Sequence, residues 1–155
     1  MTTDGLQWCR CTGNDIRPSN AVIAGFENTG EELYLARCLI GGGIHVGKAG
    51  RHMKPEGAHV GYGGIERVET DYEVLTAASP NSVVWVDVAG KCSVPGYQPV
   101  VAGREKDGRE LYCAQAVYDG SVQPGKSGRH MDGCSIAYGG REKTIPYYKV
   151  LCYTP

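Results

Sequence analysis

Two pairs of oppositely charged residues stand at the same separation in this chain. Glu27 precedes Lys48 by as many residues as Glu105 precedes Lys126, and glycines stand close to both pairs. A carboxylate accepts hydrogen bonds and an ammonium group donates three, so the two groups side by side match vicinal hydroxyls, which must both donate and accept. The alternative is a surface ion pair, worth about 0–1 kcal/mol. The nearby glycines predict loop ends, where binding residues concentrate.

A second recurring element is the sequence Gly-Arg-His-Met, which carries Arg51-His52 in the first half of the chain and Arg129-His130 in the second. An arginine beside a histidine could bind an anion or serve as acid and base. The alternative is a turn with a packed methionine and a histidine hydrogen-bonded to the backbone. We favour the turn because no shared nucleophile stands nearby in the sequence.

Three evenly spaced histidines, His45, His52 and His59, resemble the ligand types of a zinc site. Only His52 has a histidine counterpart in the second half, where Gln123 and Ser135 take the places of the other two. An odd spacing along a strand also places side chains on opposite faces. We therefore expect neither a metal site nor any other cofactor.

These elements recur because the chain contains the same unit twice. Half of the aligned positions are identical when residues 22–53 are compared with 100–131, and again when 62–75 are compared with 138–151. Two units are too few for a solenoid, which usually needs at least three. We therefore expect a closed pair of halves that bury surface against each other.

The bulk properties exclude several classes of protein. The 155 residues suffice for one ordinary domain or two small halves. A net charge of −1 without a basic block argues against a nucleic-acid partner. No apolar run is long enough to span a membrane, and residues 1–10 lack the charged head and apolar core of a signal peptide.

The cysteine content points to a reducing compartment. The chain has 7 cysteines, an odd number, and no secretory signal is recognisable, so reduced thiols in the cytoplasm are the simplest interpretation. We expect a cytoplasmic protein that would meet extracellular glycans only after release by a non-classical route.

Glycine spacing and apolar alternation predict an all-β fold. The chain has 23 glycines, and the short segments between them are rich in Val, Ile, Tyr and Leu, which is typical of short strands and tight turns. Strands are expected at 21–26, 32–40, 59–62, 72–76, 83–88, 98–104, 135–138 and 147–153, and at 112–118, the second copy of the alternating segment 32–40. We predict two antiparallel β-sheet repeats related by a pseudo-twofold axis and packed into one compact sandwich-like unit. The repeats are placed at 1–78 and 79–155, and Trp8 and Trp85 are each expected to anchor a core.

The combined pattern resembles the DM-nine repeat family. Its elements are Ala-Gly-x-Glu-x-x-Gly-x-x-Leu-Tyr-x-Ala, then Gly-Lys, Tyr-Gly-Gly-x-Glu and Tyr-x-Val-Leu, present in two copies over nearly the whole chain. The closest resemblance is to small tandem-repeat mannose-binding lectins of invertebrates. The resemblance implies that an acidic residue and a lysine in each copy hold the sugar, which by position are Glu27, Lys48, Glu105 and Lys126.

From the residues and this resemblance we expect a metal-independent lectin for mannose-type glycans. A homodimer is expected, which would raise avidity by effective concentration, together with a role in innate immunity. The alternative is an intracellular effector or scaffold that binds a protein or a membrane surface, the latter only indirectly. We do not expect an enzyme, for which the two Arg-His pairs would be the candidates.

Overall fold

The structure, a computed structural model, describes residues 5–155 as an all-β unit. The only helix in this part of the chain is the short 3-10 turn η1 (Pro80–Ser82). No helix of the described residues is long and apolar enough to cross a bilayer. The expectations for residues 1–10 and for the beginning of the first repeat fall partly on residues 1–4, which lie outside the described part.

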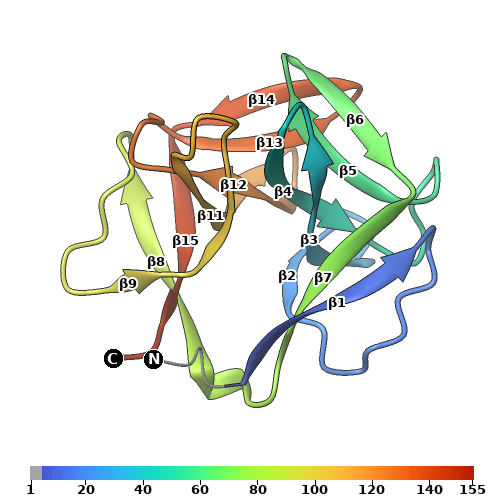
Figure 1. The fold of residues 1–155 in the computed structure, drawn as a ribbon, viewed down its shortest axis with the longest axis horizontal. Coiled ribbons are helices and arrows are strands. Elements are labelled where there is room, and N and C mark those ends of the chain that lie inside the picture. Colours follow the sequence, from blue (N-terminus) through green and yellow to red (C-terminus); the bar gives the residue numbers. More distant parts are fainter. Residues whose placement is uncertain (1–4) are drawn as a thin grey trace.

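Strands of the two repeats follow one another in the same order (Figure 1). The strands before η1 are β1 (Leu6–Thr12), β2 (Ile23–Phe26), β3 (Glu32–Ile40), β4 (Gly43–Ala49), β5 (Ala58–Tyr62), β6 (Ile65–Glu69) and β7 (Asp71–Ala77). Those after it are β8 (Val83–Ala89), β9 (Gln98–Pro99), β10 (Val101–Arg104), β11 (Glu110–Tyr118), β12 (Ser121–Ser127), β13 (Cys134–Tyr138), β14 (Arg141–Ile145) and β15 (Tyr147–Tyr153). Apart from β9, each strand after η1 has a counterpart before it, from β8 and β1 to β15 and β7.

The all-β prediction is confirmed, and each predicted strand falls on an observed one. The segment predicted at 32–40 is β3 itself, whereas the one predicted at 98–104 is divided into β9 and β10. Five strands were not predicted, namely β1, β4, β6, β12 and β14. Apolar and polar residues alternate only weakly in these five strands. Polar side chains lie on both faces of some of them, and glycine interrupts the pattern in others.

The turns expected around Lys48 and Lys126 are wrong, because both lysines lie inside strands, β4 and β12. The preceding Gly47 is needed for close approach of a neighbouring strand. A Cβ atom at Gly47 would lie 2.2 Å from the carbonyl oxygen of His59, and Gly125 is crowded in the same way. These glycines therefore mark strand packing.

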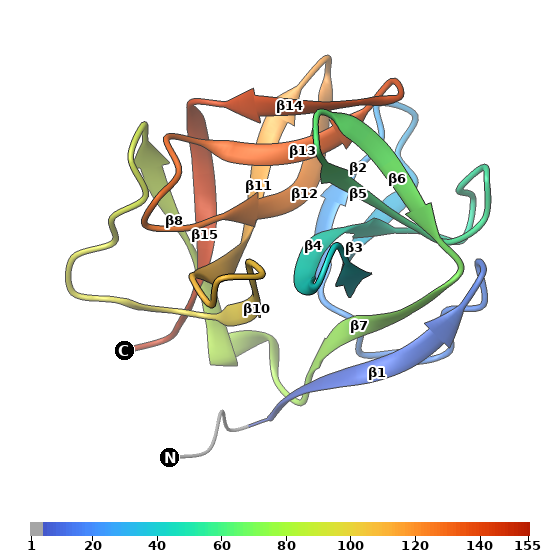
Figure 2. The same ribbon diagram turned by 45° about the horizontal axis from the view of Figure 1, so that its top comes forward.

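The two repeats pair with each other at three places. β2 pairs with β12, β10 with β4, and β14 with β6, always antiparallel and always across the repeats. A hydrogen-bonded path of strands consequently runs from β1 to β8 through both halves. In Figures 1 and 2 the halves lie on either side of the molecule, and the β5–β6 and β13–β14 hairpins meet at the top.

Three groups of buried apolar side chains form the interior. One belongs to the first repeat, a second to the second repeat, and a third joins Leu35 and Leu75 to Val100 and Leu151 across the two. All seven cysteines are free thiols, and six of them are buried. The third cluster makes the two repeats one compact unit.

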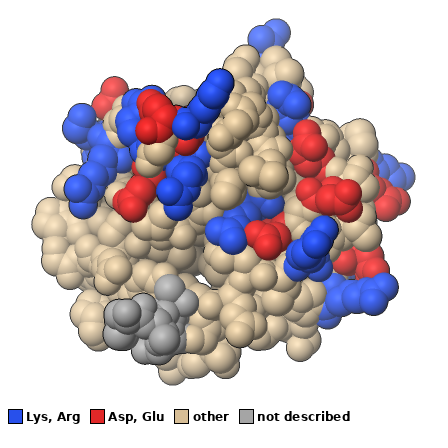
Figure 3. Space-filling model, in the orientation of Figure 1, with Lys and Arg blue, Asp and Glu red and all other residues tan. Residues whose placement is uncertain are grey.

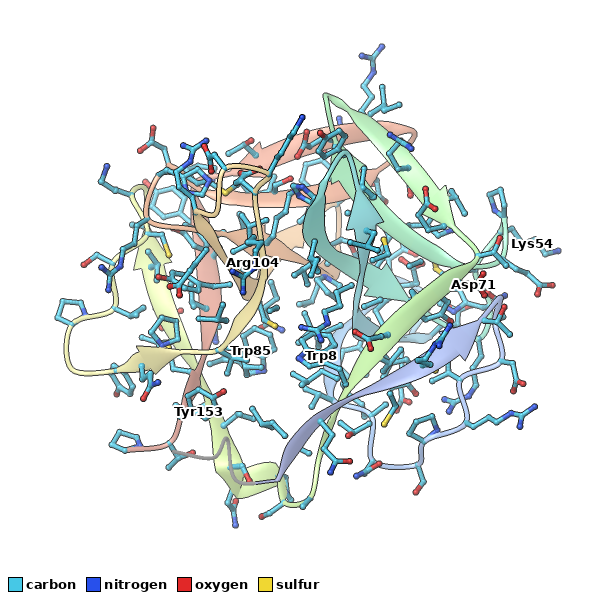
Figure 4. All side chains as sticks on the ribbon, viewed as in Figure 1. Trp8, Lys54, Asp71, Trp85, Arg104 and Tyr153 are labelled. Carbon is cyan, nitrogen blue, oxygen red and sulfur yellow. The ribbon has the colours of Figure 1, made fainter. Side chains whose placement is uncertain are left out.

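The tryptophans do not anchor the core of each half as expected. Trp8 and Trp85 are both partly exposed and both pack against the third cluster, on either side of the boundary between the repeats (Figure 4). The guanidinium carbon of Arg37 lies 4.3 Å from the centroid of the Trp8 ring, in the range of a cation–π contact. The two rings therefore cover the shared core.

A reciprocal set of hydrogen bonds joins the two hairpins. The Glu66 carboxylate accepts from the Gly140 N–H at 2.8 Å, and the Glu142 carboxylate accepts from the Gly64 N–H at 3.0 Å. The backbone N–H groups of both glutamates donate in turn to the carbonyl oxygens of these glycines, each at 3.0 Å. Both glycines adopt left-handed φ angles, near 86° and 84°, which glycine tolerates at little cost. We call these contacts the hairpin lock.

We predict that Glu66→Gln and Glu142→Gln each lower the free energy of unfolding by about 1.5–3 kcal/mol, the range for hydrogen bonds to charged groups. Urea unfolding should show a lower midpoint with an unchanged slope. Glu56→Gln, at an exposed glutamate between β4 and β5, is the matched control and should leave the midpoint in place. Equal midpoints for all three variants would show that the lock contributes nothing.

Candidate functional site

Glu27 follows the last residue of β2 and is held from two sides. Its Oε2 lies 2.9 Å from His52 Nε2, and its Oε1 accepts a hydrogen bond from Gln123 Nε2 at 3.1 Å. The side chain remains 23% exposed. Since each carboxylate oxygen can accept more than one hydrogen bond, Glu27 can still accept from a ligand.

Lys48 points from β4 into the second repeat. Its Nζ donates to Gln123 Oε1 at 2.6 Å and to the carbonyl oxygen of Ala137 at 2.8 Å. It lies 5.4 Å from the centroid of the Tyr138 ring, and the residue is only 4% exposed. With two acceptors among the described residues, the ammonium group has one donor left. Site one denotes Glu27, Lys48, His52, Gln123 and Tyr138.

The second repeat contains the equivalent arrangement. Glu105 Oε2 lies 2.8 Å from His130 Nε2, and Lys126 Nζ lies 2.7 Å from both His45 Nδ1 and the carbonyl oxygen of Gly61. The Tyr62 ring centroid is 5.8 Å from Lys126 Nζ. Site two denotes Glu105, Lys126, His130, His45 and Tyr62.

The alternative of a surface ion pair is wrong for both pairs. Each lysine is buried, and no direct ion pair among the described residues joins Glu27 to Lys48 or Glu105 to Lys126. A third polar side chain, Gln123 or His45, lies between acid and base. Each site therefore presents an acceptor and a donor with a single polar residue between them.

Comparison with known proteins bears on what these two sites are. The DM9 repeat pattern matches residues 1–55 and 51–145. The chain belongs to the DM9 repeat family. Among solved structures, the nematode sperm cell motility protein MFP2B has the same fold, with a TM-score of 0.68 and 17% sequence identity, over 95% of this chain and 46% of that one. The chain thus spans about half the length of that protein. No curated protein matches it.

The Gly-Arg-His-Met sequence of each DM9 repeat serves its site. His52 and His130 contact the carboxylates of Glu27 and Glu105, so the expectation of backbone-bonded histidines is wrong. Arg51 is structural, since it donates to the Tyr34 hydroxyl at 2.7 Å and to the Ile16 carbonyl oxygen at 2.6 Å. The recurrence of the motif was the signal for a shared role.

The three histidines of the first DM9 repeat have separate partners. His45 contacts Lys126, and His52 contacts Glu27. His59 lies 2.8 Å from Glu66 through Nδ1 and 2.7 Å from the Pro55 carbonyl oxygen through Nε2. Residues 5–155 contain no cluster of three histidine, cysteine or acidic side chains that could hold a metal ion.

Charge in the two DM9 sites is balanced inside the molecule. Burial lowers the pKa of both lysines below the ordinary value, and nearby carboxylates oppose that shift. These carboxylates are Glu66 and Glu27 at Lys48, and Glu142 and Glu105 at Lys126. Each ammonium group is therefore opposed by two acids of its own repeat, whereas its hydrogen-bond acceptors come from the other repeat.

The tautomer of His45 follows from its partner. Because an ammonium group can only donate, His45 Nδ1 must accept from Lys126, and the neutral ring carries its proton on Nε2. Burial, followed by the charge of Lys126, lowers the pKa of His45 to about 4, with partial opposition from Glu105 and Glu142. The bridging imidazole is thus neutral at physiological pH.

We predict that His45 titrates with a midpoint of about 4 instead of the ordinary 6.5, with the proton on Nε2 in the neutral form. Imidazole ¹³C and ¹⁵N resonances, assigned with His45→Gln, measure both. Between pH values of about 4 and 6.5, the unfolded chain is protonated at His45 and the folded protein is not. The free energy of unfolding should therefore rise with pH over this range. His45→Gln should remove that part of the rise. A wild-type midpoint near 6.5 would contradict the buried Lys126 contact.

Proposed function

We propose that this DM9 protein is a metal-independent lectin that recognises mannose-type glycans at site one and site two. The observation that carries the proposal is the repeated juxtaposition of a partly exposed carboxylate with an ammonium group that keeps one donor. Glu105 is 27% exposed and Glu27 is 23% exposed. An acceptor beside a donor suits adjacent sugar hydroxyls, and the resemblance to mannose-binding lectins favours mannose among hexoses.

Preorganisation supports a binding role. Each carboxylate is oriented by a histidine of its own repeat, and each ammonium group by acceptors of the other repeat. Groups that are already fixed lose little conformational entropy when a ligand binds. Charge-assisted hydrogen bonds are also the stronger kind. The sites thus combine fixed geometry with the group types that bind polyols.

Two sites in one chain allow multivalent attachment. Individual polar sugar sites are typically weak, and linking two of them raises avidity through effective concentration. Homodimerisation, which we also propose, would double the number of sites. Acidic and basic side chains are interspersed over the face seen in Figure 3, without an extended area of one sign, which is compatible with a neutral glycan ligand.

We predict that Glu27→Gln weakens sugar binding at site one, and Glu105→Gln at site two. The loss of binding free energy should be about 1.5–3 kcal/mol in each case, the range for a hydrogen bond to a charged group, which leaves the affected site unoccupied in the titration. Titration calorimetry with methyl α-mannoside should give about half the stoichiometry for each single variant and none for the double variant. Glu56→Gln is the matched control. Full binding by the folded double variant would place the site elsewhere.

Because both lysines are buried, we expect their substitution to affect stability as well as binding. Lys48→Met and Lys126→Met should abolish binding at their sites but also lower the melting temperature, because each removes a buried cation and leaves two acceptors without their donor. The glutamate variants are therefore the cleaner test of binding.

We predict that sugar binding is unchanged by EDTA, since the proposed contacts use only side-chain acceptors and donors of the two sites. Calorimetry before and after exhaustive chelation measures this. Loss of binding after chelation, with recovery on addition of calcium, would overturn the metal-independent mechanism.

A second candidate function, binding of a protein partner, has one observation in its favour. Each repeat has a groove at the equivalent place, of about 670 Å³ in the second and 480 Å³ in the first. The groove of the second repeat is the more apolar, and its Val117 and Tyr147 are 72% and 76% exposed. A glycan array separates the two candidate functions, since saturable mannose binding supports the lectin. The scaffold is supported if no glycan binds and if a protein partner of the wild type no longer binds the Val117→Ser/Tyr147→Ser variant.

A further inference from the structure

The residue that connects acid and base in each site comes from the other repeat. Gln123, on β12 of the second repeat, bridges Glu27 and Lys48, while His45, on β4 of the first, lies between Glu105 and Lys126. The two bridging residues occupy equivalent positions of the repeat. They are also chemically different, so the two sites have different geometries.

In site one the bridge is closed. Gln123 accepts from Lys48 at 2.6 Å through Oε1 and donates to Glu27 at 3.1 Å through Nε2. The amide also donates to Ser121 Oγ at 3.0 Å, which fixes its orientation. Both oxygens of Glu27 are therefore engaged within the protein, Oε2 by His52 and Oε1 by Gln123, and a ligand hydroxyl has to share Oε1 with the Gln123 amide.

In site two the bridge is open on the acid side. His45 accepts from Lys126 through Nδ1, but its Nε2 lies 3.9 Å from Glu105 Oε1, which is too long for a hydrogen bond. A hydroxyl group between these two atoms could accept from Nε2–H and donate to Oε1 at the same time. The ammonium, imidazole and carboxylate groups would then form one continuous hydrogen-bonded row through the ligand.

The surroundings fit this difference. Gly43 stands where the second repeat has Ser121, and a Cβ atom at Gly43 would lie 2.6 Å from the carbonyl oxygen of Arg104 and 3.0 Å from His45 Nε2. The glycine thus leaves room for the imidazole. The other groups that face His45 are Lys126 from β12, Glu105 after β10, Glu142 from β14 and the Tyr62 ring from β5, 4.8 Å from the imidazole centroid.

We infer that Gln123 and His45 each shape the sugar site of the opposite repeat, Gln123 by positioning the acid and base of site one and His45 by donating directly to a ligand hydroxyl in site two, and that the open His45–Glu105 arrangement makes site two the tighter site. The inference rests on the proposed lectin function and adds which residues shape each site. It follows that a substitution of Gln123 or His45 weakens the site of the opposite repeat.

The test uses full-length proteins in which one site is disabled. Glu105→Gln leaves only site one, and Glu27→Gln leaves only site two. Into each background we would introduce Gln123→Ala or His45→Ala, and measure methyl α-mannoside binding by calorimetry and folding by circular dichroism. In each background one alanine variant is the test and the other is its matched control.

In the Glu105→Gln background, Gln123→Ala should weaken binding about tenfold or more, and His45→Ala should leave it unchanged. The opposite result is expected in the Glu27→Gln background. His45→Gln in that background should restore binding to the affinity of site one, because the amide supplies the same acceptor and donor as Gln123. A general folding defect would move both alanine variants in both backgrounds.

Several outcomes overturn the inference. These are unchanged binding in the two test variants, a loss produced by the control variants, or a site two that is no tighter than site one in the single-site proteins. Failure of the lectin proposal is distinguishable, because it would show as absent binding in the wild type or full binding in the Glu27→Gln/Glu105→Gln protein. If Gln123→Ala does not fold, it is replaced by Gln123→His combined with Ser121→Gly, which supplies the same room for the imidazole as Gly43 and should give site one the affinity of site two.

Discussion

The burial of two ammonium groups is the constraint on which the rest of the structure depends. A buried cation is costly unless it is paired and hydrogen-bonded, and neither Lys48 nor Lys126 finds its acceptors in its own repeat. Lys48 needs Ala137 on β13, and Lys126 needs Gly61 on β5. These carbonyl groups are positioned by the hairpins that the hairpin lock joins. Repeat pairing, lysine burial and site geometry are therefore one linked arrangement.

The sequence predicted the fold class and the strands whose apolar residues alternate, such as β3. It could not predict β4 and β12 as strands, because Gly47 and Gly125, which permit close strand approach, look like turn residues in a linear sequence. The same misinterpretation placed the lysines on the surface. Burial of a lysine depends on acceptors supplied from far along the chain, and these become visible only when the strands are paired.

The bridging residues were beyond sequence reasoning for a different reason. Comparison of the two copies favours residues that recur, and so it selected the glutamates, the lysines and the Gly-Arg-His-Met histidines. His45 and Gln123 differ between copies, so this comparison does not select them. Their contacts also span the two repeats, with Gln123 far in sequence from Glu27. A comparison that selects identical residues overlooks the residues that make the two sites different.

The pairing of β2 with β12 and of β4 with β10 means that a single DM9 unit is incomplete. A single isolated repeat would expose strand edges, its part of the shared apolar core and a lysine without acceptors. Two separate copies could satisfy these needs only as a symmetric dimer. Every amino-acid substitution would then occur in both sites at once. Joining the units into one chain breaks that symmetry. Each half can then alter the ligand preference of the other while the shared architecture is kept.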